Sequence, residues 1–265
     1  MFTMQQYLQP SNLDEAYKIL MAKKSNTILG GCAWLRMGNK RIGNAIDLSA
    51  IDLDFIKENE EFIEIGSMTT LREIETNQIL NNYFNGILPI SIGNIIGVQF
   101  RNVVTVGGSV FSRFGFSDFI TPLLALDAEV ELYNAGRLLL KDFLKKPYEK
   151  DILIKLVIKK QNSKASYKMI RNSAGDFPLL NVAVTEKNGQ WNVVIGARPA
   201  RAEVAEKASL LLSKNEINEE NINKAMSTAV GELCFDSNKR ASKEYREEVA
   251  KVLVKRAIME VLSCK

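Results

Sequence analysis

Hydrophobic and polar positions along the first 160 residues alternate between short apolar runs and segments with helical spacing. Helices are predicted over 11–24, from Thr70 towards residue 78, and over the apolar span 80–102. Strands are predicted over 27–29, 44–48, 62–66, 103–106, 128–133 and 151–159. This part of the chain is therefore expected to mix helices with strands.

The pattern becomes more regular after the basic, polar stretch 159–166, which is the best domain boundary. Three strands are predicted over 167–170, 182–185 and 191–195, and Asn188-Gly189 favours a tight hairpin between the last two. Apolar residues then recur every three or four positions, which predicts helices over 201–213, 217–230 and 241–263. The order of elements indicates an α+β protein that ends in a three-stranded antiparallel sheet covered by helices.

The composition of the chain narrows the range of functions that it could have. The 265 residues are 46% hydrophobic and 25% charged, as in soluble globular proteins. The net charge of +4 is spread along the chain without a basic stripe, which argues against nucleic-acid binding. No apolar run approaches the ~20 residues of a membrane span. The N-terminus lacks the pattern of a signal peptide, so a cytoplasmic location is expected.

Histidine and cysteine usage excludes several kinds of active site. The chain has no histidine, so Ser-His-Asp catalysis, Cys-His catalysis and histidine-dependent zinc hydrolysis are ruled out. Its three cysteines, Cys32, Cys234 and Cys264, lie far apart, which argues against an iron–sulfur cluster or structural zinc. We predict no catalytic side chain and no metal ligand. Redox chemistry here would need an organic cofactor.

Two loops with paired glycines are the candidate ligand-binding elements of the sequence. Gly107-Gly108 follows the predicted strand 103–106 and precedes a polar stretch and Asp118, while Gly30-Gly31 follows the strand 27–29. Paired glycines let backbone N–H groups approach phosphate oxygens, and a nearby acid can accept hydrogen bonds from sugar hydroxyls. Two ordinary turns remain the alternative, because neither loop matches the dinucleotide or P-loop fingerprint.

The order and spacing of several motifs resemble the FAD-binding medium subunit, or domain, of the molybdenum hydroxylases, such as xanthine and carbon monoxide dehydrogenases. The similar blocks are Leu29-Gly30-Gly31, Ile65 to Leu71, Gln99 to Ser109, Asp118, Thr121 to Val130 and Val252 to Ala257. The resemblance implies a two-lobed FAD-binding domain of the PCMH type over 1–160, with lobes of about 1–55 and 56–160. It also implies a C-terminal domain of the CO-dehydrogenase flavoprotein type over 161–265.

The resemblance also implies the residues that hold FAD. The backbone of the two glycine loops would hold the pyrophosphate, and Asp118 would bind ribityl or ribose hydroxyls. Ile95, Asp176 and Phe177 would approach the flavin. The complete set is Leu29, Gly30, Gly31, Cys32, Ala33, Trp34, Ile95, Thr105, Gly107, Gly108, Ser109, Ser112, Asp118, Asp176 and Phe177.

By resemblance, the chain is an electron-transfer flavoprotein subunit. Its electrons would come from a [2Fe–2S] subunit in a complex with a molybdopterin-containing large subunit, and would pass to NAD⁺ or another acceptor. Two alternatives stay open: a stand-alone FAD-dependent oxidoreductase, and a diverged, non-catalytic assembly subunit of the same fold. The assembly-subunit alternative is supported by departures from the family pattern at Cys32-Ala33, Ser109 and residues 113–116.

Overall fold

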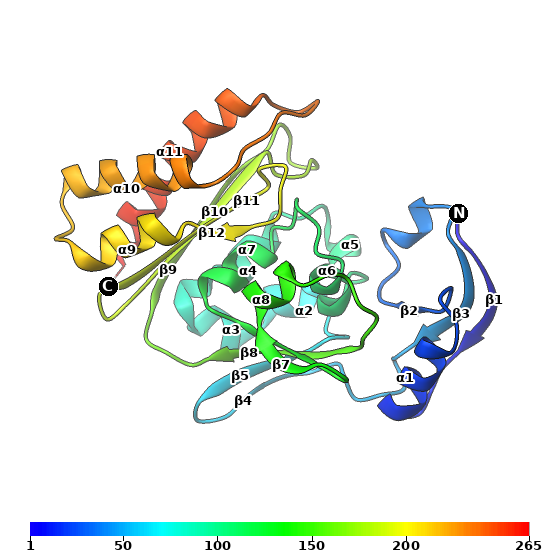
Figure 1. Ribbon diagram of the computed structural model, residues 1–265. Coiled ribbons are helices and arrows are strands. Elements are labelled where there is room, and N and C mark those ends of the chain that lie inside the picture. Colours follow the sequence, from blue (N-terminus) through cyan, green and yellow to red (C-terminus); the bar gives the residue numbers. More distant parts are fainter. Residues whose placement is uncertain (265) are drawn as a thin grey trace. The chain divides into compact units, whose positions relative to one another are not determined.

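The computed structural model describes residues 1–264, which form two compact units (Figure 1). The first unit contains residues 1–73, 97–112 and 128–158, and the second contains residues 74–96, 113–127 and the chain from 159 onward. Each unit therefore combines three separate stretches of chain. No helix among the described residues has the length and apolar character needed to cross a membrane.

A three-stranded parallel sheet begins the first unit. Its strands, in spatial order, are β1 (Thr3–Leu8), β3 (Arg41–Asp47) and β2 (Thr27–Leu29). Helix α1 (Leu13–Ala22) begins at Asn12, whose side chain accepts a hydrogen bond from the Glu15 N–H at 2.9 Å. Ala16 and Leu20 of this helix pack in one buried cluster with Ile46 of β3. The sheet and helix thereby fix where β2 ends and the first glycine loop begins.

The second sheet of this unit has five strands. Their spatial order is β4 (Ile56–Glu58), β5 (Phe62–Gly66), β8 (Leu153–Lys159), β6 (Glu129–Leu132) and β7 (Gly136–Leu139). The β4–β5, β6–β7 and β6–β8 pairs are antiparallel. Helices α6 (Val106–Phe111) and α8 (Leu140–Lys145) contact this sheet. The short segments η1 (Leu35–Met37) and α5 (Val98–Arg101) belong to the same unit, and α2 (Leu71–Thr76) begins in this unit and ends in the second.

Two predictions for the central part of the chain are wrong. The run 103–106 is not a strand: Thr105 caps α6, and the glycine pair lies in the first turn of that helix. The span 80–102 is not one helix but is divided among α3 (Gln78–Asn82), η2 (Phe84–Gly86), α4 (Ile87–Gly93) and α5. Positive φ angles at Asn85 (52°), Gly86 (66°) and Gly97 (59°) interrupt the right-handed helical backbone.

The second unit is built on a four-stranded antiparallel sheet. Its order is β12 (Glu203–Val204), β11 (Gln190–Gly196), β10 (Leu180–Lys187) and β9 (Lys164–Ile170). The Asn188-Gly189 hairpin is confirmed, with φ of 50° and 78° at its two central residues. The three predicted strands are present, but the prediction missed β12 and so began the next helix too early.

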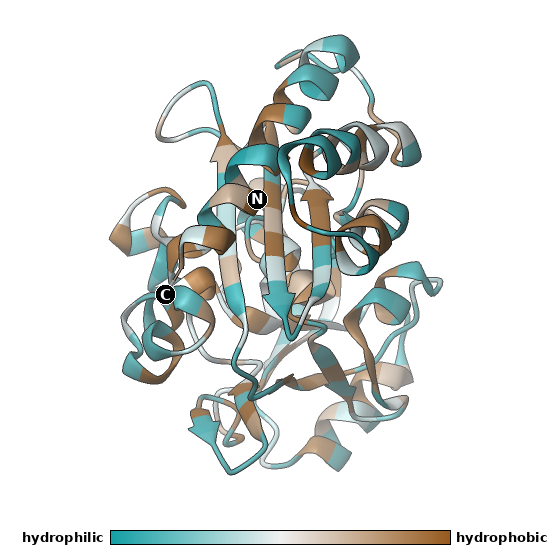
Figure 2. Ribbon diagram, turned by 90° about the vertical axis from the view of Figure 1, so that its left-hand side faces the viewer, coloured by the Kyte–Doolittle hydropathy of each residue, from teal (hydrophilic) through white to brown (hydrophobic). Residues whose placement is uncertain are grey.

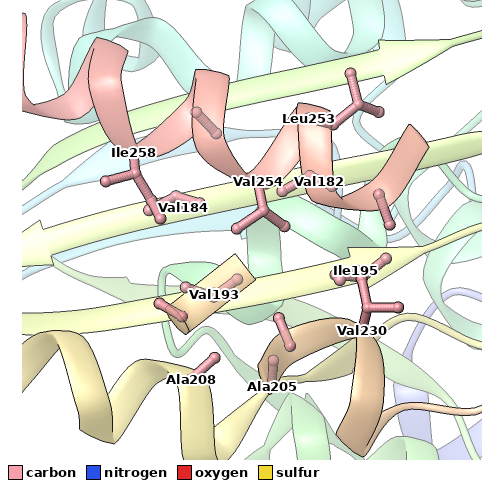
Figure 3. Close-up of a cluster of buried hydrophobic side chains, with 14 of the residues drawn as sticks. Val182, Val184, Val193, Ile195, Ala205, Ala208, Val230, Leu253, Val254 and Ile258 are labelled. Atoms are coloured by element: carbon pink, nitrogen blue, oxygen red, sulfur yellow. The ribbon is translucent and has the colours of Figure 1, made fainter. Parts of the chain in front are cut away.

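Helices cover both faces of this sheet. On one face lie α9 (Glu206–Lys214), α10 (Glu219–Glu232) and α11 (Lys243–Ser263), and on the other lie α4 and α7 (Ile120–Ala125). Val182 and Val184 of β10 meet Val254 and Ile258 of α11 in an extended core cluster (Figure 3). The intervening residues of β10 (Asn181, Ala183 and Thr185) are buried as well, although two of them are polar, so both faces of this strand are covered. Figure 2 colours each residue by hydropathy and shows bands of hydrophilic and hydrophobic residues along the helices.

Candidate cofactor site

The first glycine loop runs directly against the segment that leads into α6. A Cβ atom placed on Gly31 would lie 1.5 Å from the Val103 carbonyl oxygen, and one on Gly30 would lie 2.9 Å from Thr105 Oγ1. Only glycine permits such a close approach of backbone to backbone. The two paired-glycine loops, nearly eighty residues apart in sequence, are therefore brought together within the first unit.

The second loop owes its shape to hydrogen bonds made inside the chain. Thr105 Oγ1 accepts from the Gly108 N–H at 3.1 Å, and the Thr105 carbonyl accepts from the Ser109 N–H at 3.0 Å. The Gly107 N–H donates to the Ser67 carbonyl at 2.7 Å. These three N–H groups stabilise the first turn of α6. The N–H groups of residues 107–109 therefore already donate within the chain, which leaves the first glycine loop as the better candidate to approach phosphate oxygens.

A cavity of about 680 Å³ opens where the two loops meet. Six of the predicted site residues line it: Leu29, Gly30, Thr105, Gly107, Gly108 and Ser112. Lysines 24, 40 and 150 and the aromatic ring of Tyr148 also line it. Its volume falls within the roughly 300–1,000 Å³ that is usual for cofactor and ligand sites.

Ser67 provides the clearest sign that the cavity fits a polar ligand. The residue lines the cavity and is 3% exposed, yet its hydroxyl has no hydrogen-bond partner within the chain. Buried hydroxyls are almost always satisfied, so an unpartnered one in the wall of a cavity is a candidate to bond a ligand or water held there. With two glycine loops and a lysine-bearing wall, the site suits the phosphates of FAD. Sequence reasoning missed Ser67, although it lies within the matching block 65–71.

Lys150 has a different task from the other two lysines. Its ammonium group donates to the carbonyl oxygens of Leu20 (3.1 Å), Lys23 (2.8 Å) and Asn26 (3.0 Å). Burial lowers the pKa of this lysine, and the charge of Lys40 lowers it further. Since its three donors are all used, Lys150 holds the end of α1 in place, next to the start of β2.

The other predicted residues of the first unit do not line this cavity. Cys32 has a positive φ of 55°, and its thiol donates to the Gly30 carbonyl at 3.1 Å. Burial, then the charge of Asp47, raises the pKa of that thiol, which disfavours a reactive thiolate. Trp34 is 48% exposed. Gly31, Ala33 and Ser109 are likewise outside the residues that line the cavity.

Asp118 belongs to the second unit and is 6% exposed. Its Oδ1 accepts hydrogen bonds from the Tyr167 hydroxyl at 2.5 Å and from Arg171 Nη2 at 3.0 Å. Burial raises the pKa of Asp118, against the opposing effect of the Arg171 charge. Burial also raises the pKa of Tyr167 well above its usual value, so the phenol stays protonated and donates.

The remaining predicted residues of this unit lie in two turns. Ile95 is half-buried and donates its N–H to the Ile92 carbonyl at the end of α4. Asp176 forms an ion pair with Arg240 at 3.0 Å, and the Arg240 guanidinium lies 5.3 Å from the centre of the Phe177 ring. Within residues 1–264, no three His, Cys, Asp or Glu side chains are grouped so as to hold a metal ion.

Two family models match this chain, and together they cover most of its length. Residues 2–160 match the FAD-binding domain in molybdopterin dehydrogenases, and residues 165–261 match the C-terminal domain of CO dehydrogenase flavoproteins. The first match alone covers more than half of the chain. The predicted resemblance and the predicted FAD cofactor are therefore confirmed.

Relatives of known name match over nearly their whole length. The chain is 26% identical to the glyceraldehyde dehydrogenase medium chain of Sulfolobus acidocaldarius, covering 96% of this chain and 97% of that protein. It is 23% identical to the nicotine 6-hydroxylase medium subunit of Paenarthrobacter nicotinovorans, with 96% of each covered.

Solved structures confirm the fold. The chain superposes on a chain of CO dehydrogenase from Oligotropha carboxidovorans with a TM-score of 0.90 at 20% identity, over 98% of both chains. It superposes on quinoline 2-oxidoreductase from Pseudomonas putida with a TM-score of 0.86, also at 20% identity, over 98% of this chain and 97% of that chain. Taken with the family matches, these findings mean that the chain belongs to the FAD-binding medium subunits of the molybdenum hydroxylase family of oxidoreductases.

Proposed function

We propose that this chain is the electron-transfer subunit of a molybdenum hydroxylase complex, which takes electrons from a [2Fe–2S] partner and delivers them to NAD⁺ or another acceptor. The observation that carries the proposal is the cavity between the two glycine loops, with the unpartnered Ser67 hydroxyl at its wall. The absence of histidine from the sequence is consistent with this role, since bound FAD would supply the redox chemistry.

The residues of the first unit would hold the pyrophosphate part of FAD. Leu29 and Gly30 of the first loop and Thr105, Gly107, Gly108 and Ser112 of the second line the cavity, and we propose that the backbone continuing to Trp34 contributes beside them. Because the N–H groups of residues 107–109 already donate within the chain, we assign the phosphate contacts of this unit chiefly to the first loop, Ser67, Lys24 and Lys40. In the second unit, Asp118 would accept from ribityl hydroxyls, and Ile95, Asp176 and Phe177 would contact the flavin.

The partners follow from the relatives' names. A medium chain or medium subunit implies companion chains, and we propose a [2Fe–2S] subunit and a molybdopterin-containing large subunit. Substrate oxidation would take place on the large subunit. The two family matches meet between residues 160 and 165, which supports the proposed boundary between domains 1–160 and 161–265.

The test is the visible spectrum of the purified chain before and after FAD is added. We expect flavin bands near ~450 nm and about one FAD released per chain on denaturation. The bound flavin is then photoreduced under anaerobic conditions and mixed separately with NAD⁺ and with oxygen, and recovery of the bands identifies the acceptor. A chain that stays colourless in excess FAD would overturn the proposal and favour the assembly subunit, whereas steady turnover of a simple substrate by the isolated chain would favour the stand-alone oxidoreductase.

A further inference from the structure

Arg171 joins three segments of the second unit that are far apart in sequence. Its Nη2 donates to the Asp118 carboxylate at 3.0 Å. Its Nη1 donates to two main-chain carbonyls, that of Asn94 at 2.8 Å and that of Asp176 at 3.1 Å. Each of these three residues either is a proposed flavin-site residue or directly precedes one.

The contacts use the fork geometry that only arginine offers. The Arg171 side chain is 7% exposed and Asp118 is 6% exposed, so the ion pair is largely shielded from water. The Nε atom lies 3.2 Å from the sulfur of Met169, which holds the guanidinium from the β9 side. A lysine would bring one point charge and could not reach the carboxylate and both carbonyls in fixed directions at once.

We propose that Arg171 is the positioning residue of the flavin end of the site: it sets the places of Ile95, Asp118 and Phe177 together, and it holds the Asp118 carboxylate in its charged form. This inference rests on the proposed function, because the three segments are assigned to the flavin there. Arg171 itself is not assigned a contact with the cofactor.

The charge part of the proposal follows from what surrounds Asp118. Burial favours the protonated acid, while Arg171 and the Tyr167 hydroxyl favour the carboxylate. Both of these donors use Oδ1, as the hydrogen bonds show. Without the guanidinium, Asp118 would be a buried acid whose charge is favoured only by the Tyr167 hydroxyl and the Asn181 side chain, and a neutral carboxyl is a weaker acceptor for sugar hydroxyls.

The experiment compares the FAD dissociation constant and the midpoint potential of bound flavin in a set of variants of the whole chain. Arg171→Gln is expected to weaken FAD binding by about tenfold or more, because three segments lose their common anchor. Arg171→Lys keeps the charge but loses the fork, so we expect weaker binding with an unchanged potential. The control is Arg198→Gln, which removes another buried arginine whose partners include Cys234 and Glu203 but no proposed flavin residue.

The potential separates positioning from mere loss of stability. In Arg171→Gln the potential should fall as pH is raised through the altered pKa of Asp118, because the carboxylate then carries an uncompensated charge, whereas at lower pH the neutral acid leaves the potential near wild type. In Asp118→Asn an uncompensated Arg171 would raise the potential throughout, and the double variant would return towards wild type. Arg198→Gln should lower the melting temperature without moving the potential. Wild-type FAD affinity and wild-type potential in both Arg171 variants would overturn this inference but not the proposed function. Shifts of the flavin potential in the same direction in Arg171→Gln, Asp118→Asn and the double variant would do the same. A wild-type chain that takes up no FAD would overturn the proposed function, and this inference with it.

Discussion

Gly31 is the residue at which the site tolerates the least change. In Gly31→Ala the new Cβ would lie 1.5 Å from the Val103 carbonyl oxygen, so the two glycine loops must move apart. We expect a loss of about 2–3 kcal/mol in unfolding free energy, measured by urea denaturation, together with weakened FAD binding. Gly231→Ala is the matched control, because a Cβ there meets nothing within 4 Å. Since Gly231 lies in α10, that substitution should raise stability, by up to about 1 kcal/mol.

Ser67 should show opposite effects on stability and on binding. In the absence of FAD, Ser67→Ala removes a buried hydroxyl that has no partner in the chain, and we expect the protein to gain about 1 kcal/mol in stability. Because the same hydroxyl is assigned to a cofactor phosphate, FAD should bind about tenfold more weakly. The two readouts are thermal unfolding without FAD and fluorescence titration with it.

The control for Ser67 is a buried serine whose hydroxyl is already satisfied. Ser91 is 0% exposed and donates to the Leu88 carbonyl at 2.8 Å, so Ser91→Ala should lower stability. Unchanged FAD affinity in Ser67→Ala would remove Ser67 from the site, whatever its effect on stability.

At the scale of elements, the sequence predicted structure well where the deciding contacts are local. The Asn188-Gly189 turn depends on residues within a few positions and forms as expected, and the Asn12 cap of α1 is likewise a local contact. The stretch 103–106 has strand-like composition, yet a cap by Thr105 and a bond from Gly107 to the distant Ser67 make it enter a helix. Such contacts between separate parts of the chain leave no signal in a local pattern.

Helix α11 is tied to β9 by a charged group that should make stability depend on pH. Glu260 pairs with Lys168 and accepts from the Ser166 hydroxyl at 2.5 Å. Although burial raises the pKa of Glu260, these partners outweigh it and hold the pKa below its usual value. The stabilisation is therefore present above the unfolded pKa of about 4.3 and is lost as pH falls through the lower folded value.

We accordingly expect Glu260→Gln to lose roughly 0.5 kcal/mol at pH 7, a modest amount because the side chain is 45% exposed. The difference from wild type should disappear near pH 3, as measured by denaturant unfolding across that range. Lys168→Met should lose a similar amount, and the double variant should lose less than the sum of the two. A difference that persists unchanged at pH 3 would contradict the ion-pair explanation.

At the scale of the whole molecule, the candidate site illustrates what a single sequence can and cannot predict. The glycine loops and Asp118 were proposed as site residues because small residues and an isolated acid are visible one position at a time. Arg171 was not, because its importance arises from residues 94, 118 and 176 meeting in space. Ser67 was missed for the same reason, since an unpartnered hydroxyl can be recognised only once its surroundings are known.

The two compact units do not coincide with the proposed domains 1–160 and 161–265. This difference predicts how the protein will behave when the chain is divided at residue 160. Residues 74–96 and 113–127 precede residue 160 in sequence but belong to the second unit, where α7 packs on β10 and β11. Every residue of α7 is buried there, and the Thr185 hydroxyl donates to the Ala125 carbonyl at 2.7 Å. A fragment 1–160 would expose this apolar helix to water, since the sheet that covers it lies beyond the cut.

We therefore expect fragment 1–160 to aggregate when expressed alone, and fragment 161–265 to be partly unfolded, because one face of its sheet has lost α4 and α7. Co-expression of the two fragments should restore a soluble complex with the far-ultraviolet circular dichroism of the intact chain. The intact chain is the control, and it should unfold without a stable intermediate that corresponds to either fragment. If fragment 1–160 alone is monomeric and melts cooperatively, α7 does not need the sheet, and the boundary near 160 separates two domains that fold independently.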